Sequence, residues 1–177
     1  MKNIIILLLL ILLQSCNTNR KDTVVSKNKA IVENKEIYEI EIPIYDFSEL
    51  EPLLNKKNDT TYVVNFWATW CKPCIKELPF FEQLGKQYAS KNVKVILVSL
   101  DFPDKLETQV IPFVKARDLK SEVVLLDDPD ANNWIPKVDK DWSGAIPATL
   151  IYNDKGRNFY EKSFTFEELE TELNTIL

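Results

Sequence analysis

The sequence has no histidine, and its 177 residues include only three glycines and one methionine. Without histidine, the chain cannot form a Ser–His or Cys–His catalytic pair, and it lacks the commonest nitrogen ligand for metals. The three glycines are too few and too scattered for a glycine-rich phosphate loop. A formal net charge of -5 gives no sign of a basic nucleic-acid surface. We therefore expect no bound metal, no cofactor and no nucleic-acid partner.

The N-terminus predicts export from the cytoplasm. A short basic start precedes the apolar run Ile4–Leu13, which is far below the roughly 20 residues of a membrane-spanning helix and fits a signal peptide. The run ends at Leu13-Gln14-Ser15-Cys16, which resembles a bacterial lipobox. We expect residues 1–15 to be a lipoprotein signal peptide and Cys16 to carry the lipid. The alternative is a membrane anchor or an ordinary signal with an incidental cysteine.

Three cysteines are present, so a lipid on Cys16 leaves one pair, Cys71 and Cys74. A disulfide between them closes a very small ring and adds little loop-closure stabilisation, which favours a reactive pair over a structural one. Cys71 follows a strand-like run and begins helix-like sequence, where backbone N–H groups and the helix dipole favour a thiolate. Thiolates attack disulfides, so the pair predicts thiol–disulfide exchange.

Hydrophobic periodicity and turn residues divide the rest of the chain into a flexible polar tether at 16–36 and one folded domain at 37–177. Capping boxes are expected at Asp46/Glu49 and Thr165/Glu168. Strands alternate with helices and end in a hairpin, which predicts an α/β fold with a mixed central sheet. We expect strands at 37–44, 61–68, 93–100, 122–126, 148–152 and 157–162, and helices at 46–58, after Cys71 with a kink at Pro79, at 104–118, and from Thr165.

Two segments carry a family resemblance. Asn65-Phe66-Trp67-Ala68-Thr69-Trp70-Cys71-Lys72-Pro73-Cys74, followed by Glu77-Leu78-Pro79, resembles the active-site helix of the thioredoxin superfamily, in particular its membrane-attached TlpA/ResA-like branch. Gly144-Ala145-Ile146-Pro147-Ala148-Thr149 resembles that family's cis-proline loop. The extra helix and strand between residues 100 and 130 match the insertion of this branch. The resemblance implies a thioredoxin-like fold with a helix–strand insertion.

The resemblance also implies roles at the cysteine motif. Cys71 is the expected nucleophile, partly exposed at the helix start and with a lowered pKa, and Cys74 is the buried resolving thiol. Pro73 stiffens the first turn of the helix. Trp70 either shields the sulfurs or packs in the core, and Lys72 either tunes the thiolate or is an ordinary solvated lysine.

Glu77 shares a helix face with Cys74 and is the expected general base. Ordinary thioredoxins use an aspartate on the preceding strand, where this chain has Asn65, which cannot take a proton. The alternative is an exposed glutamate without a role. A cis bond at Pro147, implied by the resemblance, would present Ile146 backbone groups to an extended peptide substrate. An ordinary trans proline opening a strand is the alternative.

Two weaker patterns lie between residues 128 and 142. Acidic and amide residues from Asp128 to Asp139 approach the spacing of a calcium loop, but Asn133 occupies the position that requires glycine, so calcium is not expected. Trp134 and Trp142 either pack against a core edge or line a partner surface, and packing is favoured.

The expected protein is a lipid-anchored thiol–disulfide oxidoreductase of the bacterial cell envelope, facing the periplasm or the outer surface. It would reduce disulfides of exported proteins with electrons from a membrane thiol donor. The alternatives are a disulfide oxidase or isomerase, and a non-catalytic binding lipoprotein with this fold. A peroxidase is disfavoured because Ala68 occupies the position where a peroxidatic cysteine requires threonine.

Overall fold

The computed structural model describes residues 40–177. The expected signal peptide, the tether and Cys16 lie outside the described residues, as does the start of the strand expected at 37–44. Between residue 40 and residue 177, no helix has both the length and the apolar character needed to cross a membrane.

The described chain alternates between strands and helices, and short 3₁₀ and π segments join or extend the helices. The strands are β1 (Ile44–Tyr45), β2 (Thr61–Trp67), β3 (Val93–Ser99), β4 (Glu122–Leu126), β5 (Ala148–Tyr152) and β6 (Arg157–Tyr160). The helices are α1 (Phe47–Leu50), α2 (Lys72–Tyr88), α3 (Ile111–Arg117), α4 (Ala131–Val138) and α5 (Phe166–Asn174). The remaining segments are 3₁₀ at Glu51–Leu54, Ala89–Lys91 and Pro103–Lys105, and π at Leu106–Val110.

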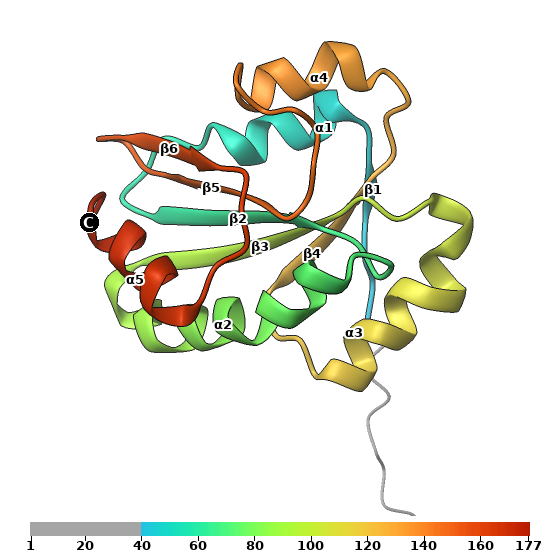
Figure 1. The fold of residues 1–177 in the computed structure, drawn as a ribbon, viewed down its shortest axis with the longest axis horizontal. Coiled ribbons are helices and arrows are strands. Elements are labelled where there is room, and N and C mark those ends of the chain that lie inside the picture. Colours follow the sequence, from blue (N-terminus) through green and yellow to red (C-terminus); the bar gives the residue numbers. More distant parts are fainter. Residues whose placement is uncertain (1–39) are drawn as a thin grey trace, which may run out of the picture. The chain divides into compact units, whose positions relative to one another are not determined.

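The six strands form one mixed sheet in the order β1-β4-β3-β2-β5-β6 (Figure 1). Strands β1, β4, β3 and β2 are parallel, and β5 and β6 continue the sheet as an antiparallel hairpin. Since β2 and β3 are parallel neighbours with Trp67 paired to Ser99, their carboxyl ends meet at one edge of the sheet. The loops that follow both strands therefore lie beside each other, and Cys71 is in the first of them.

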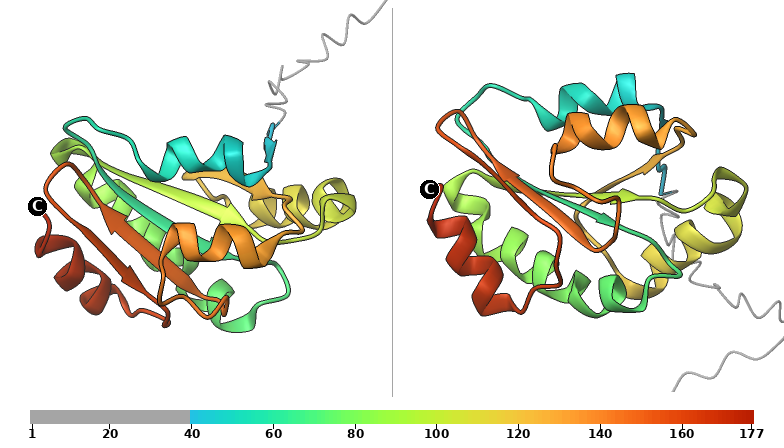
Figure 2. Two further views of the ribbon diagram at one scale, coloured as in Figure 1. Left: turned by 90° about the horizontal axis from the view of Figure 1, so that it is seen from above. Right: turned by 45° about the horizontal axis from the view of Figure 1, so that its top comes forward.

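Helices cover both faces of the sheet: α2, α3 and α5 lie on one side, and α1 with α4 on the other (Figures 1 and 2). Strand β2 contributes to both cores because successive side chains of a strand point to opposite faces. Val63 and Trp67 join the core under α2 and α5, whereas Val64 and Phe66 join the core under α1 and α4. Asn65 lies between Val63 and Trp67 in this alternation, so its amide points towards α2.

The predicted α/β class with a mixed sheet is confirmed, and so are both capping boxes. Several boundaries are corrected. Within the described residues the first strand is only Ile44–Tyr45, and the helix expected at 46–58 ends at Leu54. The helix expected at 104–118 is split into three segments, and the last of them begins at Ile111 with Pro112 in its first turn, where a missing N–H is tolerated. Helix α2 contains Pro79, where a kink is expected, and runs on to Tyr88.

Helix α4 was not predicted, because Pro136 lies within it and its first turn is polar. It places Trp134 against Trp142, with ring centroids 5.5 Å apart, and each tryptophan exposes 5% of its surface. The packing interpretation of these two residues is therefore correct.

Candidate active site

Cys71 and Cys74 form a disulfide at the start of α2, with their Cα atoms 5.3 Å apart. Cys71 is the N-cap residue of the helix, and its sulfur accepts a hydrogen bond of 3.3 Å from the backbone N–H of Cys74. The backbone N–H of Cys71 in turn donates to the carbonyl of Ala68. When the pair is reduced, an N–H group aimed at the Cys71 sulfur from a helix N-terminus favours its thiolate form.

The segment around Pro147 lies against this disulfide. The Ile146–Pro147 peptide bond is cis, as the family resemblance implies, and the Ile146 carbonyl oxygen is 3.8 Å from the Cys71 sulfur. Cys71 exposes only 5% of its surface, which corrects the expected partial exposure, because this segment covers the sulfur. Trp70 is 61% exposed, so it does not pack in the core.

Glu77 lies on α2, one turn after Cys74, and is 1% exposed. Its carboxylate accepts hydrogen bonds from the Asn65 side-chain amide at 2.9 Å and from the backbone N–H of Phe164 at 2.8 Å. Burial raises the pKa of Glu77 to about 7, although the bonds from Phe164 and Asn65 oppose this rise. Glu77 is therefore not the exposed helical residue of the alternative interpretation, and it can exchange a proton near neutral pH.

Asn65 holds Glu77 from the strand. Its amide nitrogen donates to Glu77 and also lies 3.2 Å from the hydroxyl of Thr149, which pairs with it on β5. Its amide oxygen is buried without a hydrogen-bond partner. A buried acceptor of this kind can receive a bond if Glu77 gains a proton and the amide turns over.

A second buried carboxylate, Asp101, follows β3 and ties the two loops together. Asp101 is 2% exposed and accepts hydrogen bonds from the backbone N–H and the hydroxyl of Thr69, at 2.9 and 2.5 Å, and from the hydroxyl of Ser99 at 2.8 Å. Thr69 stands two residues before Cys71, so this carboxylate fixes the loop that carries the cysteine. No sequence motif pointed to Asp101, although the carboxyl end of a parallel strand is a usual place for a functional residue.

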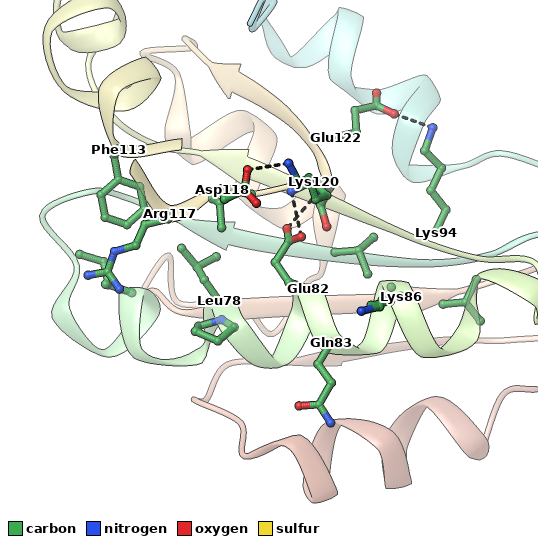
Figure 3. A pocket seen from close by; sticks show the side chains of 17 residues that line it. Leu78, Glu82, Gln83, Lys86, Lys94, Phe113, Arg117, Asp118, Lys120 and Glu122 are labelled. Atoms are coloured by element: carbon green, nitrogen blue, oxygen red, sulfur yellow. Dashed lines mark hydrogen bonds and ion pairs between the residues drawn. The ribbon is translucent and has the colours of Figure 1, made fainter. Parts of the chain in front are cut away.

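A groove of about 980 Å³ lies away from the disulfide, between α2 and the loop after α3 (Figure 3). Leu78 and Phe113 line its apolar part, and the Glu82 carboxylate bonds to the backbone N–H groups of Lys120 and Ser121. Neither cysteine lines this groove, so it offers no binding site at the sulfurs. Its Glu82 bonds serve to hold the loop after α3 against α2.

Residues 45–157 match the AhpC/TSA family. The chain belongs to the AhpC/TSA family. The Bacillus subtilis thioredoxin-like protein YneN is 35% identical to this member over 115 residues, which are 63% of the chain and 62% of YneN. The thiol-disulfide oxidoreductase ResA of Bacillus cereus is 44% identical over 62 residues, 35% of the chain and 34% of ResA. The matched part of the chain thus spans less than two thirds of these curated relatives.

The fold of this AhpC/TSA member is similar to that of solved structures. The crystal structure of StoA from Bacillus subtilis superposes with a TM-score of 0.52 at 28% sequence identity, over 67% of this chain and 84% of StoA. The thioredoxin-like fold expected from the two motifs is therefore confirmed.

In this AhpC/TSA domain we expect Asp101→Ala to lower the free energy of unfolding by about 2 kcal/mol, because it leaves the donors of partly buried Thr69 and of buried Ser99 without this acceptor. Urea denaturation of the oxidised protein measures the change. Asp104→Ala is the matched control: its side chain is 67% exposed and pairs only with Lys105, so the expected loss is below about 0.5 kcal/mol. Equal losses in the two variants would contradict a fastening role for Asp101.

Proposed function

We propose that the protein is a thiol–disulfide oxidoreductase that reduces disulfides of exported proteins through a Cys71/Cys74 dithiol. The observation that supports this most directly is the cysteine pair at the N-terminus of α2, with a backbone N–H directed at the Cys71 sulfur. The name of the relative ResA, a thiol-disulfide oxidoreductase, agrees with this chemistry.

The reduced pair acts in two exchange steps. The Cys71 thiolate attacks one sulfur of the substrate disulfide, so that a Cys71–substrate disulfide forms and the other substrate sulfur leaves as a thiolate. Cys74 then loses its proton, and its sulfur attacks the Cys71 sulfur. The Cys71–Cys74 disulfide forms and the second substrate thiolate leaves. The dithiol has given two electrons to the substrate.

Glu77 is the proposed acceptor of the Cys74 proton, because it shares a helix face with Cys74 and has a pKa of about 7. Pro73, in the first turn of α2, stiffens the motif. Trp70, Ile146 and Pro147 shape the approach to the sulfur, and the Ile146 backbone can pair with an extended substrate segment.

The cellular setting is proposed from the N-terminal sequence. Residues 1–15 would be a signal peptide, Cys16 a lipid-carrying N-terminus, 16–36 a tether and 37–177 the thioredoxin-like domain. The protein would then face the periplasm or the outer surface of the cell envelope. Structural disulfides form in such oxidising spaces, so repeated reduction of substrates requires a membrane thiol donor that returns two electrons to the Cys71–Cys74 disulfide.

The reduction potential of the pair tests the direction of electron flow. We expect a potential below about -220 mV, in the range of thioredoxin and the glutaredoxins, since these act as reductants. Equilibration with glutathione redox buffers, read by alkylation of free thiols, measures it. A potential near -120 mV, as for strong oxidants, would instead support an oxidase or isomerase. Resistance of Cys71 to alkylation after mild reduction, together with no reduction of insulin, would support a non-catalytic binding protein.

A further inference from the structure

Two aromatic rings project into solvent beside the active site. Phe102 is 71% exposed and Trp70 is 61% exposed, more than any other large hydrophobic residue of the described part of the chain. The next most exposed large hydrophobic residues are Ile44 at 44% and Leu177 at 40%. Large aromatic side chains bury substantial apolar area when a partner covers them, so two of them exposed on loops that are bonded to each other indicate a binding surface.

The loops that carry these rings are fastened to each other. The backbone N–H of Leu100 donates to the carbonyl of Trp67, and Thr69 donates twice to the Asp101 carboxylate. Trp70 and Phe102 each stand one residue beyond a member of the Thr69–Asp101 pair. Because Asp101 is buried and both of its side-chain oxygens accept hydrogen bonds, it holds both loops in place before a substrate arrives.

The position of Cys71 explains why a contact outside the sulfurs is needed. Trp70 directly precedes Cys71, whose residue surface is only 5% exposed. A substrate disulfide therefore has to be held against a largely covered sulfur. The groove of Figure 3 and a smaller hollow beside Ile40 contain neither Cys71 nor the two rings. Apart from the Ile146 backbone at 3.8 Å from the Cys71 sulfur, the exposed group next to the cysteine in the chain is the apolar ring of Trp70.

We propose that Phe102, with Trp70, forms a docking surface for an apolar side chain close to the disulfide of a polypeptide substrate. Phe102 has no polar atom in its side chain, so it discriminates by burying apolar area and disfavours a polar neighbour. The substrate class is then a protein segment in which a large apolar residue flanks the cysteine. This inference rests on the proposed function and specifies which protein disulfides the site accepts.

The test uses the reduced full chain and two otherwise identical disulfide-bridged peptides, with either leucine or serine beside the cysteine. We expect wild-type kcat/KM to be about tenfold higher for the leucine peptide, as burial of one apolar side chain allows. In Phe102→Ala the ratio falls to about one, and Phe102→Leu restores most of it. Leu177→Ala is the control for loss of an exposed apolar residue, because α5 ends at the opposite edge of the sheet (Figure 1); it keeps the wild-type ratio.

Two results would overturn the inference: no preference for leucine in the wild type, or a preference that persists in Phe102→Ala. A uniform loss on both peptides would also overturn it, because it would make Phe102 a structural residue. Bis(2-hydroxyethyl) disulfide, a small substrate without apolar side chains, separates these failures from failure of the proposed function. If the wild type does not reduce even this compound, the oxidoreductase proposal itself is wrong.

Discussion

Cys74→Ser is expected to stop turnover at the covalent complex between Cys71 and a substrate. The variant retains the proposed attacking sulfur at the N-cap of α2 but has no second thiol to release the substrate. Steady-state reduction should fall by roughly 10³-fold or more, as for the loss of a residue that acts in chemistry. Expression in the native host, followed by non-reducing electrophoresis and mass spectrometry, should identify the substrates bound to Cys71.

Cys71→Ser is the matched control, because it removes the other sulfur of the same disulfide. It should abolish turnover to the same extent and trap nothing through position 71. If Cys74 in this variant captures the same proteins in equal yield, then the roles of the two sulfurs are reversed. The burial of Cys74, which is 0% exposed, argues against that outcome.

Glu77→Gln is expected to slow the second exchange step about 100-fold at about pH 8, since a positioned general base contributes on the order of 10²–10⁴-fold. With a pKa of about 7, the wild-type carboxylate is charged above that pH and can accept the Cys74 proton. Below it, the carboxyl group is already protonated. The wild-type rate of release should therefore fall as the pH drops through 7. This dependence of the rate on pH should be absent in Glu77→Gln. Acid quenching and thiol alkylation at successive times measure the decay of the mixed disulfide.

The same substitution has a second readout in the oxidised protein, where the cysteines do not titrate. Because folding raises the pKa of Glu77 from 4.5 to about 7, the folded state binds the proton more tightly than the unfolded state. The contribution of Glu77 to stability is then fully present below pH 4.5 and is lost as the pH rises through 7, by on the order of 3 kcal/mol. Glu77→Gln should remove this loss, and Glu82→Gln on the same helix should keep it. Equal release rates for wild type and Glu77→Gln at about pH 8 would contradict the base role even if the stability change is observed.

Local sequence patterns predicted the elements that depend on local interactions. The capping boxes at Asp46 and Thr165 and the hairpin before Arg157 involve residues close in sequence, and all are present. The strands β2 and β3 were predicted correctly because the central strands of a sheet covered on both faces are continuous apolar runs in the sequence. The antiparallel pairing of β5 with β2 joins residues more than 80 positions apart, such as Asn65 and Ala148, and it was not predicted from the sequence.

The missed features of the candidate site depend on contacts between distant parts of the chain. Asp101 meets Thr69 across 32 positions, which no local pattern reveals. The covering of Cys71 depends on Ile146, 75 residues away. The sequence pointed to Glu77 as a base through its spacing from Cys74, but its burial comes from Asn65 and Phe164 and could be read only from the fold.

The bond from the Phe164 backbone to Glu77 joins α2 to the segment just before α5, 87 positions later in the chain. An ionised carboxylate accepts that bond more strongly than a neutral acid does. Each arrival or departure of a proton at Glu77 therefore changes how firmly the C-terminal helix is anchored at its first turn. The anchoring of α5 therefore follows the protonation state of Glu77, although α5 lies far from the cysteines in the sequence.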